Sequence, residues 1–266
     1  MRRRTFLTAA ASGTVAGVAG CLGDSGGSGG NADTYLSAPD TDHDPETLPY
    51  PAYGQPLPEV TLTDPIAGRE VTTTEFDRDV LVTFFYSHCM SVCPVLIAAM
   101  EGVQEQAAAK GYGDDVVFLA VTFDPQRDDG ERLQKYAKKR DVDLDAGNWH
   151  FLRPDSPGRA KTVVQETFGV NFRRTSGMGG GTTTTAGTDA ETATKTTRID
   201  ETETVTPADE TTDATTPAAT GNYMFTHLGL ILLANRDDHV ERAYQGNAPA
   251  WKPIYEDFGR LRKNEG

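Results

Sequence analysis

The chain has 266 residues, a formal net charge of −14 and a sequence pI near 4.7. This acidic balance argues against a nucleic-acid partner, because proteins that bind phosphate backbones do so with clustered lysine and arginine. The length suits one domain of ordinary size once signal, linker and low-complexity segments are set aside. An acidic excess with few lysines and abundant threonine is typical of a halophilic source.

The first residues indicate a targeting segment rather than part of the fold. The run RRTFL at residues 3–7 matches a twin-arginine export signal, and a weakly apolar stretch follows up to Gly20. The run VAGC at residues 18–21 resembles a lipobox, whose cysteine becomes the lipid-bearing N-terminus. An uncleaved membrane helix is the alternative, but the stretch is too short and too rich in small residues. We therefore predict a signal segment over 1–21, a lipid anchor on Cys21, and a location on the cell membrane facing outside the cytoplasm.

Two further segments are low in complexity. Residues 22–50 are rich in Gly, Ser, Asp and Pro without periodicity, which predicts a flexible tether with a span of roughly 30 Å. A Thr-rich acidic tract over about 175–220 lacks the large apolar residues that a core requires, so we predict disorder there. Long insertions cost little loop-closure entropy. The folded domain is therefore expected over 51–266 with this insertion inside it.

The remaining pattern alternates strands with helices. The run over 115–123 is apolar throughout, as in a sheet that is covered on both faces. The order of elements predicts a thioredoxin-like α/β fold, with a central mixed sheet flanked by helices and a C-terminal hairpin and helix. We expect strands over 59–63, 80–86, 115–123 and 149–152, helices over 94–110, 128–140 and 156–168, a hairpin over 228–233 and 240–244, and a last helix over 249–262.

Cys89 and Cys93 stand where a predicted strand gives way to a predicted helix. Pro94 is tolerated in the first helical turn, so the thiols are expected about one turn apart at a helix N-terminus. Backbone N–H groups and the helix dipole there favour thiolate over thiol. Such a pair can bind a soft metal ion or form a disulfide. With Cys21 assigned to the anchor, these two thiols alone remain, in an oxidising compartment.

Four segments together carry a family resemblance: YSHCMSVCP at 86–94, VTFDPQRD at 121–128, WHFL at 149–152 and YMFTH at 223–227. In their order and spacing they resemble the Sco/SenC family of copper chaperones for cytochrome oxidase assembly. The likeness spans nearly the whole folded region. Two positions depart from the family pattern, because Met90 stands where proline is usual and Thr226 stands where an acidic residue usually precedes the histidine.

The resemblance implies that Cys89, Cys93 and His227 bind copper, as Cu(I) or Cu(II). Two thiolates and an imidazole suit soft Cu(I), and three ligands suit a metal that is to be handed on. The implied recipient is the copper A centre in the copper-binding subunit of a terminal oxidase. Asp124 is expected to support the loop or a docking surface; a plain Asp-Pro turn with Pro125 is the equal alternative.

Other soft or titratable side chains near the motif are not expected to be ligands. His88 neighbours the cysteines and could tune their pKa, but alternation along the strand points its side chain away from the metal. Packing or solvent exposure is the expectation for Met90, Met178 and Met224. A structural role is expected for His43, His150 and His239.

Two other functions compete with the chaperone. One is a thiol–disulfide reductase that keeps the oxidase's copper-ligand cysteines reduced. Such enzymes usually carry C-x-x-C and a facing cis-proline, whereas this chain has C-x-x-x-C and no proline close before Phe225. Both facts favour metal binding, although the family resemblance is compatible with both activities, so whether the protein is also an enzyme stays open. The other is a redox-inert module with a structural disulfide, which leaves His227 without a purpose.

Overall fold

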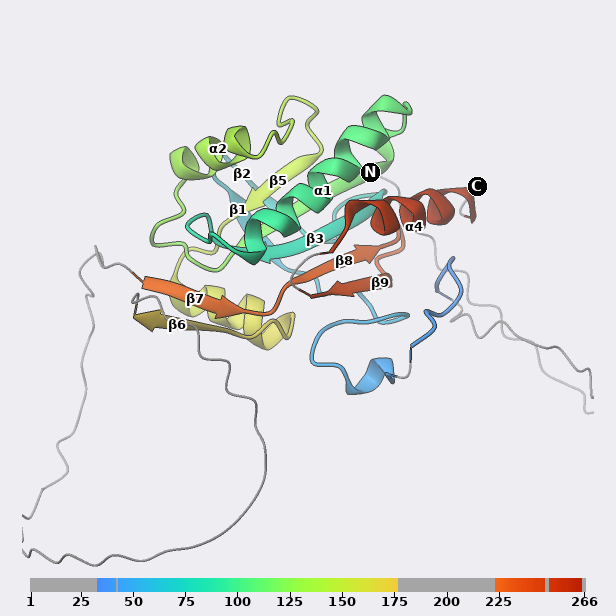
Figure 1. Cartoon of the computed structure of the whole chain (residues 1–266), viewed down its shortest axis with the longest axis horizontal. Coiled ribbons are helices and arrows are strands. Elements are labelled where there is room, and N and C mark those ends of the chain that lie inside the picture. The colour runs from blue at the N-terminus through green and yellow to red at the C-terminus, as the bar shows by residue number, and fades with distance from the viewer. Residues whose placement is uncertain (1–32, 42, 177–222, 247–248, 265–266) are drawn as a thin grey trace, which may run out of the picture.

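A computed structural model describes residues 33–41, 43–176, 223–246 and 249–264 (Figure 1). The predicted signal segment with Cys21, the first part of the tether, and Met178 with the tract over 177–220 lie outside these residues. Within the described ranges, no helix has both the length and the apolar character needed to cross a bilayer.

The centre of the fold is a five-stranded sheet in the order β5-β4-β3-β8-β9. Its middle strands, β3 (Asp79–Phe85) and β4 (Val116–Thr122), run parallel and are buried at every residue. β5 (Trp149–Leu152) adds parallel to β4, while β8 (Leu230–Ala234) adds antiparallel to β3 and pairs with β9 (Val240–Gln245). The predicted mixed sheet and terminal hairpin are thus confirmed.

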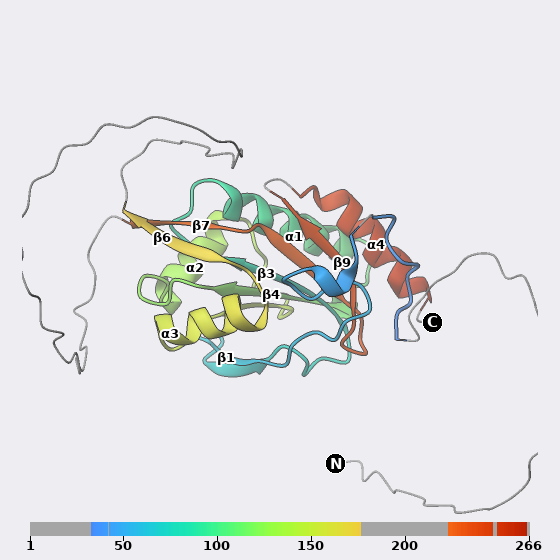
Figure 2. The same cartoon turned by 90° about the horizontal axis from the view of Figure 1, so that it is seen from below.

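Helices cover both faces of this sheet. Neighbouring residues of β3 show the two layers, because Phe85 stacks on Tyr136 of α2 (Gly130–Lys139) at 5.4 Å while Phe84 packs on Phe168 at 4.9 Å. Phe168 ends the helical segment formed by α3 (Pro157–Ala160) and its π-helical continuation over Lys161–Thr167. Figure 2 shows α1 (Val92–Ala109) and α4 (Trp251–Asn264) together on the side opposite α3. The thioredoxin-like α/β architecture predicted from the order of elements is confirmed.

Two small antiparallel pairs complete the fold, and the sequence pattern predicted only part of them. β1 (Thr61–Asp64) pairs with β2 (Arg69–Thr72). β6 (Phe172–Ser176) pairs with β7 (Tyr223–His227) across the undescribed tract. β2 and β6 are short and largely polar, so neither carries the apolar alternation by which a strand is found.

The described part of the predicted tether is packed on the domain. Leu36 and Tyr50 are buried, and the backbone N–H groups of Tyr35 and Leu36 donate to the two carboxylate oxygens of buried Glu241 in β9, at 2.7 and 3.0 Å. A flexible tether is therefore not the state of residues 33–41 and 43–50. Two apolar side chains and one buried carboxylate that needs donors suffice to hold the segment.

Candidate metal site

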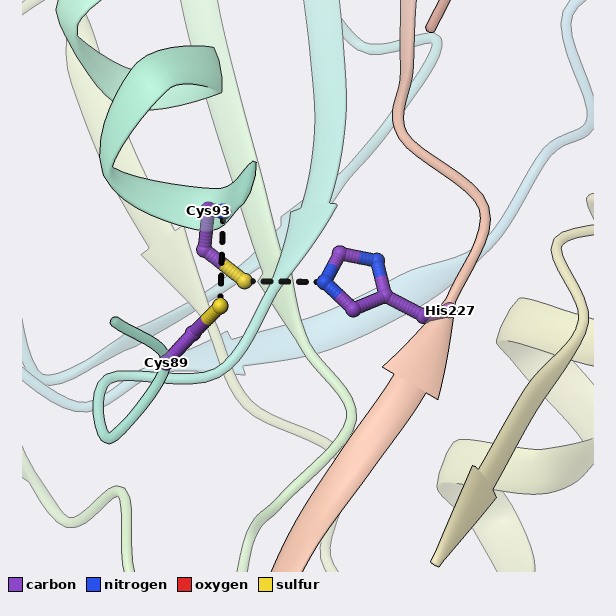
Figure 3. Close-up of side chains that lie close together, drawn as sticks. All are labelled: Cys89, Cys93 and His227. Carbon is purple, nitrogen blue, oxygen red and sulfur yellow. Dashed lines mark hydrogen bonds between the residues drawn. The ribbon is translucent and has the colours of Figure 1, made fainter. Parts of the chain in front are cut away.

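Three predicted side chains meet at one end of the central sheet (Figure 3). Cys89 lies in the loop after β3, Cys93 lies in the first turn of α1, and His227 ends β7. The Sγ of Cys93 is 3.0 Å from Nε2 of His227, and one ligand atom from each of the three residues lies within 4.8 Å of the other two. Both thiols are free of a disulfide. The structure therefore brings together side chains that are 134 positions apart in sequence.

The helix N-terminus contributes directly to this geometry. α1 begins at Val92, and the backbone N–H of Cys93 donates to the Sγ of Cys89 at 3.4 Å. This N–H is one of the groups that have no partner inside the helix, so a sulfur with negative charge satisfies it. Cys89 is 4% exposed and Cys93 is fully buried.

The two thiols ionise very differently. The hydrogen bond from Cys93 lowers the pKa of Cys89 far below that of a free cysteine; burial opposes this shift, and a hydrogen bond from Ser91 adds to it. Burial raises the pKa of Cys93, and the neighbouring Cys89 thiolate raises it further. In the reduced site without metal, Cys89 is therefore a thiolate and Cys93 is a thiol, and the thiol donates a hydrogen bond to the thiolate. A metal that binds both sulfurs has to displace the Cys93 proton.

A backbone carbonyl orients the His227 imidazole. Its Nδ1 lies 3.0 Å from the carbonyl oxygen of Leu228, and this contact assigns the proton to Nδ1. The lone pair on Nε2 then faces the Sγ of Cys93 at 3.0 Å. Thr226, which occupies the family's acidic position, is exposed to solvent. The orienting partner that metal-ligating histidines usually have is supplied here by main chain.

Aromatic side chains hold β7 against the sheet. The rings of Phe123 and Tyr86 lie 5.0 and 6.1 Å from the His227 ring. The hydroxyl of Tyr86 accepts a hydrogen bond from the backbone N–H of Phe225 at 3.2 Å. Phe172 of β6 is the register partner of His227. The imidazole thus lies against apolar ring faces and edges, which limits the directions in which it can turn.

Asp124 is a positioning residue rather than a member of the sulfur–imidazole trio. It is buried at the end of β4, accepts a hydrogen bond from the hydroxyl of Tyr223 at 2.6 Å, and pairs with Arg127. Its carbonyl also accepts from the N–H groups of Arg127 and Asp128 in a turn. Asp124 thus forms the turn and also links that turn to the first residue of β7, while its support of the metal site stays a prediction.

Two residues that the sequence did not single out brace the cysteine loop. The buried carboxylate of Asp128 accepts from the backbone N–H of Ser87 at 3.0 Å and from the hydroxyl of Thr122 at 2.5 Å. Arg132 of α2 donates to the carbonyl and the hydroxyl oxygen of Ser87 at 3.0 and 2.7 Å. Burial raises the pKa of Asp128 despite these hydrogen bonds. Their partner lies more than forty positions earlier in the chain, so no local pattern signals this role.

The residues that were expected to be structural face elsewhere. His88 lies near Asp128, at 3.9 Å, and not toward the sulfurs. The hydroxyl of Tyr86 donates to the sulfur of Met224 at 3.9 Å. His150 is buried against Asp64 at 2.9 Å, and His239 contacts the carbonyl oxygen of Asp237. Met90 is 85% exposed and His43 is on the surface.

Comparison with known proteins agrees with the geometry. Residues 61–188 match the SCO1/SenC family model. A curated relative, the SCO1 protein homolog of Bacillus subtilis, is 25% identical over 111 residues, which are 41% of this chain and 55% of that protein. The chain thus matches about half the length of this relative. The family-model match ends before β7, so His227 is placed at the site by the fold alone.

Solved structures extend the likeness to the whole fold. A SCO1/SenC family lipoprotein from Bacillus anthracis superposes with a TM-score of 0.53 at 18% identity, over 79% of this chain and 96% of that one. Arabidopsis thaliana ScoI, solved with copper bound, gives a TM-score of 0.50 at 16% identity, over 80% and 99%. Fold, family model and curated relative all point the same way: this chain contains a SCO1/SenC domain, matched over residues 61–188, and has a thioredoxin-like fold.

Proposed function

We propose that this protein is a copper chaperone, anchored to the outer side of the cell membrane, that passes copper to the copper A centre of a terminal oxidase. The observation that carries the proposal is the convergence of two thiols and one imidazole lone pair from distant segments. Cys89, Cys93 and His227 are the proposed ligands. The anchor on Cys21 rests on the sequence pattern.

The three donor atoms are better suited to binding copper than to forming a structural zinc site. Two sulfurs and one imidazole are soft or borderline donors that suit Cu(I), and a fourth ligand completes a Cu(II) site. A structural zinc site needs four protein ligands, whereas the cluster that includes these cysteines has three in the described part of the chain. The copper-bound ScoI of Arabidopsis thaliana has the same overall fold, which supports the proposal.

The residues of the site perform distinct tasks in uptake and release. Cys89, already a thiolate, supplies the first attractive charge for a cuprous ion. Binding of Cys93 then releases one proton from its sulfur to solvent, because Nε2 of His227, 3.0 Å away, keeps its lone pair for the metal. Release reverses the exchange, because a recipient's ligands replace these donors one at a time while a proton returns to Cys93.

A copper titration tests the proposal. The reduced chain without its signal segment is titrated with Cu(I) against a chromophoric chelator. We expect one tightly bound Cu(I) per chain and loss of that site in the Cys89→Ser, Cys93→Ser double variant. Undiminished binding after both substitutions would contradict the proposal.

A thiol–disulfide reductase is the second candidate, and the ionised Cys89 beside Cys93 favours it. In exchange, the Cys89 thiolate attacks a partner disulfide, forms a mixed disulfide and expels one partner thiolate. Cys93 then loses its proton and attacks the Cys89 sulfur, which breaks the mixed disulfide, releases the second partner sulfur as a thiol and leaves Cys89–Cys93 oxidised. However, stabilising the thiolate stabilises the reduced pair, which makes the couple a weaker reductant. We therefore expect a poorly reducing potential and slow exchange, and a strongly reducing, fast couple would favour the enzyme.

A further inference from the structure

A basic hollow adjoins Cys89 although the chain as a whole is acidic. Cys89, Met90 and Pro94 line one side of this hollow, and the facing side comes from α2 and the residue after it. None of the residues that line it is acidic, while the whole chain has 39 acidic and 25 basic residues. The basic side chains that line it are Arg132, Lys135, Lys139 and Arg140.

These basic side chains differ in the contacts that they already make within the domain. Arg132 is bound to Ser87 and supports the cysteine loop. Arg140 lies over the Tyr136 ring at 5.3 Å. Lys135 and Lys139 are exposed; Lys135 pairs with Glu131 on the solvent side, where both side chains are more than two-thirds exposed. Such exposed pairs are weak, so Lys135 is available to another carboxylate.

An exposed apolar side chain stands beside these lysines. Met90 is 85% exposed, and Trp251 at 39% is the other large hydrophobic residue that is exposed in the described part of the chain. Methionine and arginine are enriched in protein interfaces, where an apolar centre is ringed by polar groups. Met90 directly follows Cys89 and both residues line the hollow, so a partner that covers Met90 also lies over Cys89.

We propose that Met90, Lys135, Lys139 and Arg140 form a docking surface for an acidic protein partner that exchanges copper at Cys89. The partner's matching surface carries carboxylates around an apolar patch that receives Met90. This inference rests on the proposed chaperone function. The contribution of the charges should fall as salt is added, because the screening length drops from about 10 Å at 0.1 M to about 3 Å at 1 M.

Charge reversal tests the surface with a matched control. The probe is a synthetic glutamate-rich peptide with a central methionine, and its glutamine analogue shows whether the charges matter. The test variant is Lys135→Glu, Lys139→Glu; the control is Lys138→Glu, Lys252→Glu, which has the same net charge and also reverses one exposed lysine in the last turn of α2. Anisotropy of a labelled peptide measures affinity for the reduced chain without its signal segment.

We expect the test variant to weaken peptide binding on the order of tenfold and the control to change it less than twofold. Met90→Ala should weaken it as well, by a few-fold. Equal losses in test and control variants, or wild-type binding to anionic vesicles without binding to the peptide, would overturn the docking surface. Cu(I) titration separates the two proposals: the test variant should retain full copper affinity, and a wild type that binds the peptide but no copper would contradict the chaperone function alone.

Discussion

The two halves of the metal site are built differently. The cysteine half, which consists of Cys89 and Cys93, directly continues the buried core. β3 is buried throughout, Cys93 is fully buried, and Asp128 and Arg132 hold the loop between them in place. The histidine half lies on β7, in a two-stranded sheet outside the central one, with His227 only half-buried. Side-chain contacts to Asp124 and Tyr86 hold it in place. A fixed pair of sulfurs and a separately held imidazole suit a metal that must be retained and then surrendered.

Removing a sulfur should have the largest effect. Cys93→Ser keeps the size of the side chain but replaces a soft thiolate with a hard hydroxyl that does not ionise at neutral pH. We expect Cu(I) affinity to fall by more than about a hundredfold, beyond the range seen for outer-shell changes. Chelator competition measures it. Ser37→Ala, at an exposed serine of the N-terminal segment, is the control and should stay close to wild type.

Removing the imidazole should cost less. His227→Ala leaves both sulfurs in place, and two thiolates alone still bind Cu(I). We expect a loss of about ten- to a hundredfold, smaller than for Cys89→Ser, in the same competition assay. His43→Ala, which changes a surface histidine, is the matched control. A loss as large as that of the cysteine variants would show that the two halves are not as distinct as their construction indicates.

Loosening β7 without touching a ligand should have a still smaller effect. Tyr223→Phe deletes the hydroxyl that donates to Asp124, and we expect a several-fold loss of copper affinity with about 1–2 kcal/mol of unfolding free energy. Tyr244→Phe is the matched control, because that hydroxyl also donates to a carboxylate, Asp257 at 2.8 Å, away from the site.

The comparison of these two tyrosine variants isolates positioning from stability. Tyr244→Phe should lower the free energy of unfolding by a similar amount while copper affinity stays near wild type. Denaturant unfolding and chelator competition on both variants decide the matter. If both lose copper affinity equally, the Asp124–Tyr223 link supports only the fold.

The same division separates what sequence could predict from what it could not. The cysteine half was predictable because its strand, turn and helix are consecutive in the sequence. The run from Val80 to Pro94 is therefore enough to place the two cysteines relative to each other. The central sheet followed from its long apolar runs for the same reason. The tether prediction was wrong for residues 33–41 and 43–50, because burial of Leu36 and Tyr50 depends on a surface formed some 200 residues later.

The histidine half depended on a family resemblance rather than on local pattern. Nothing in YMFTH states that β7 pairs with β6, that Leu228 orients the imidazole or that Tyr223 reaches Asp124. Those contacts join segments up to about a hundred positions apart. Asp128 and Arg132 escaped notice for the same reason, since their shared partner Ser87 lies far upstream.

The smallest expected effect comes from the different ionisation of the two cysteines. Because the pKa of Cys89 is lowered and that of Cys93 is raised, the reduced apoprotein should hold one thiolate at about pH 7, where free cysteine with a pKa near 8.5 is mostly protonated. Ultraviolet thiolate absorbance measures it, and Cys89→Ser should abolish the signal at that pH while Cys93→Ser should retain a thiolate.

Stability of the reduced apoprotein should follow the same two shifts. The lowered pKa of Cys89 contributes stability that is full above the unfolded pKa of about 8.5 and declines as the pH falls below it. The raised pKa of Cys93 acts oppositely, because its stabilising effect is full below about 8.5 and declines as the pH rises. Unfolding free energy should therefore peak near that pH, and Cys89→Ser should remove the acid-side slope. An unchanged slope in this variant would mean that other groups set the acid-side pH dependence and would contradict a lowered pKa for Cys89.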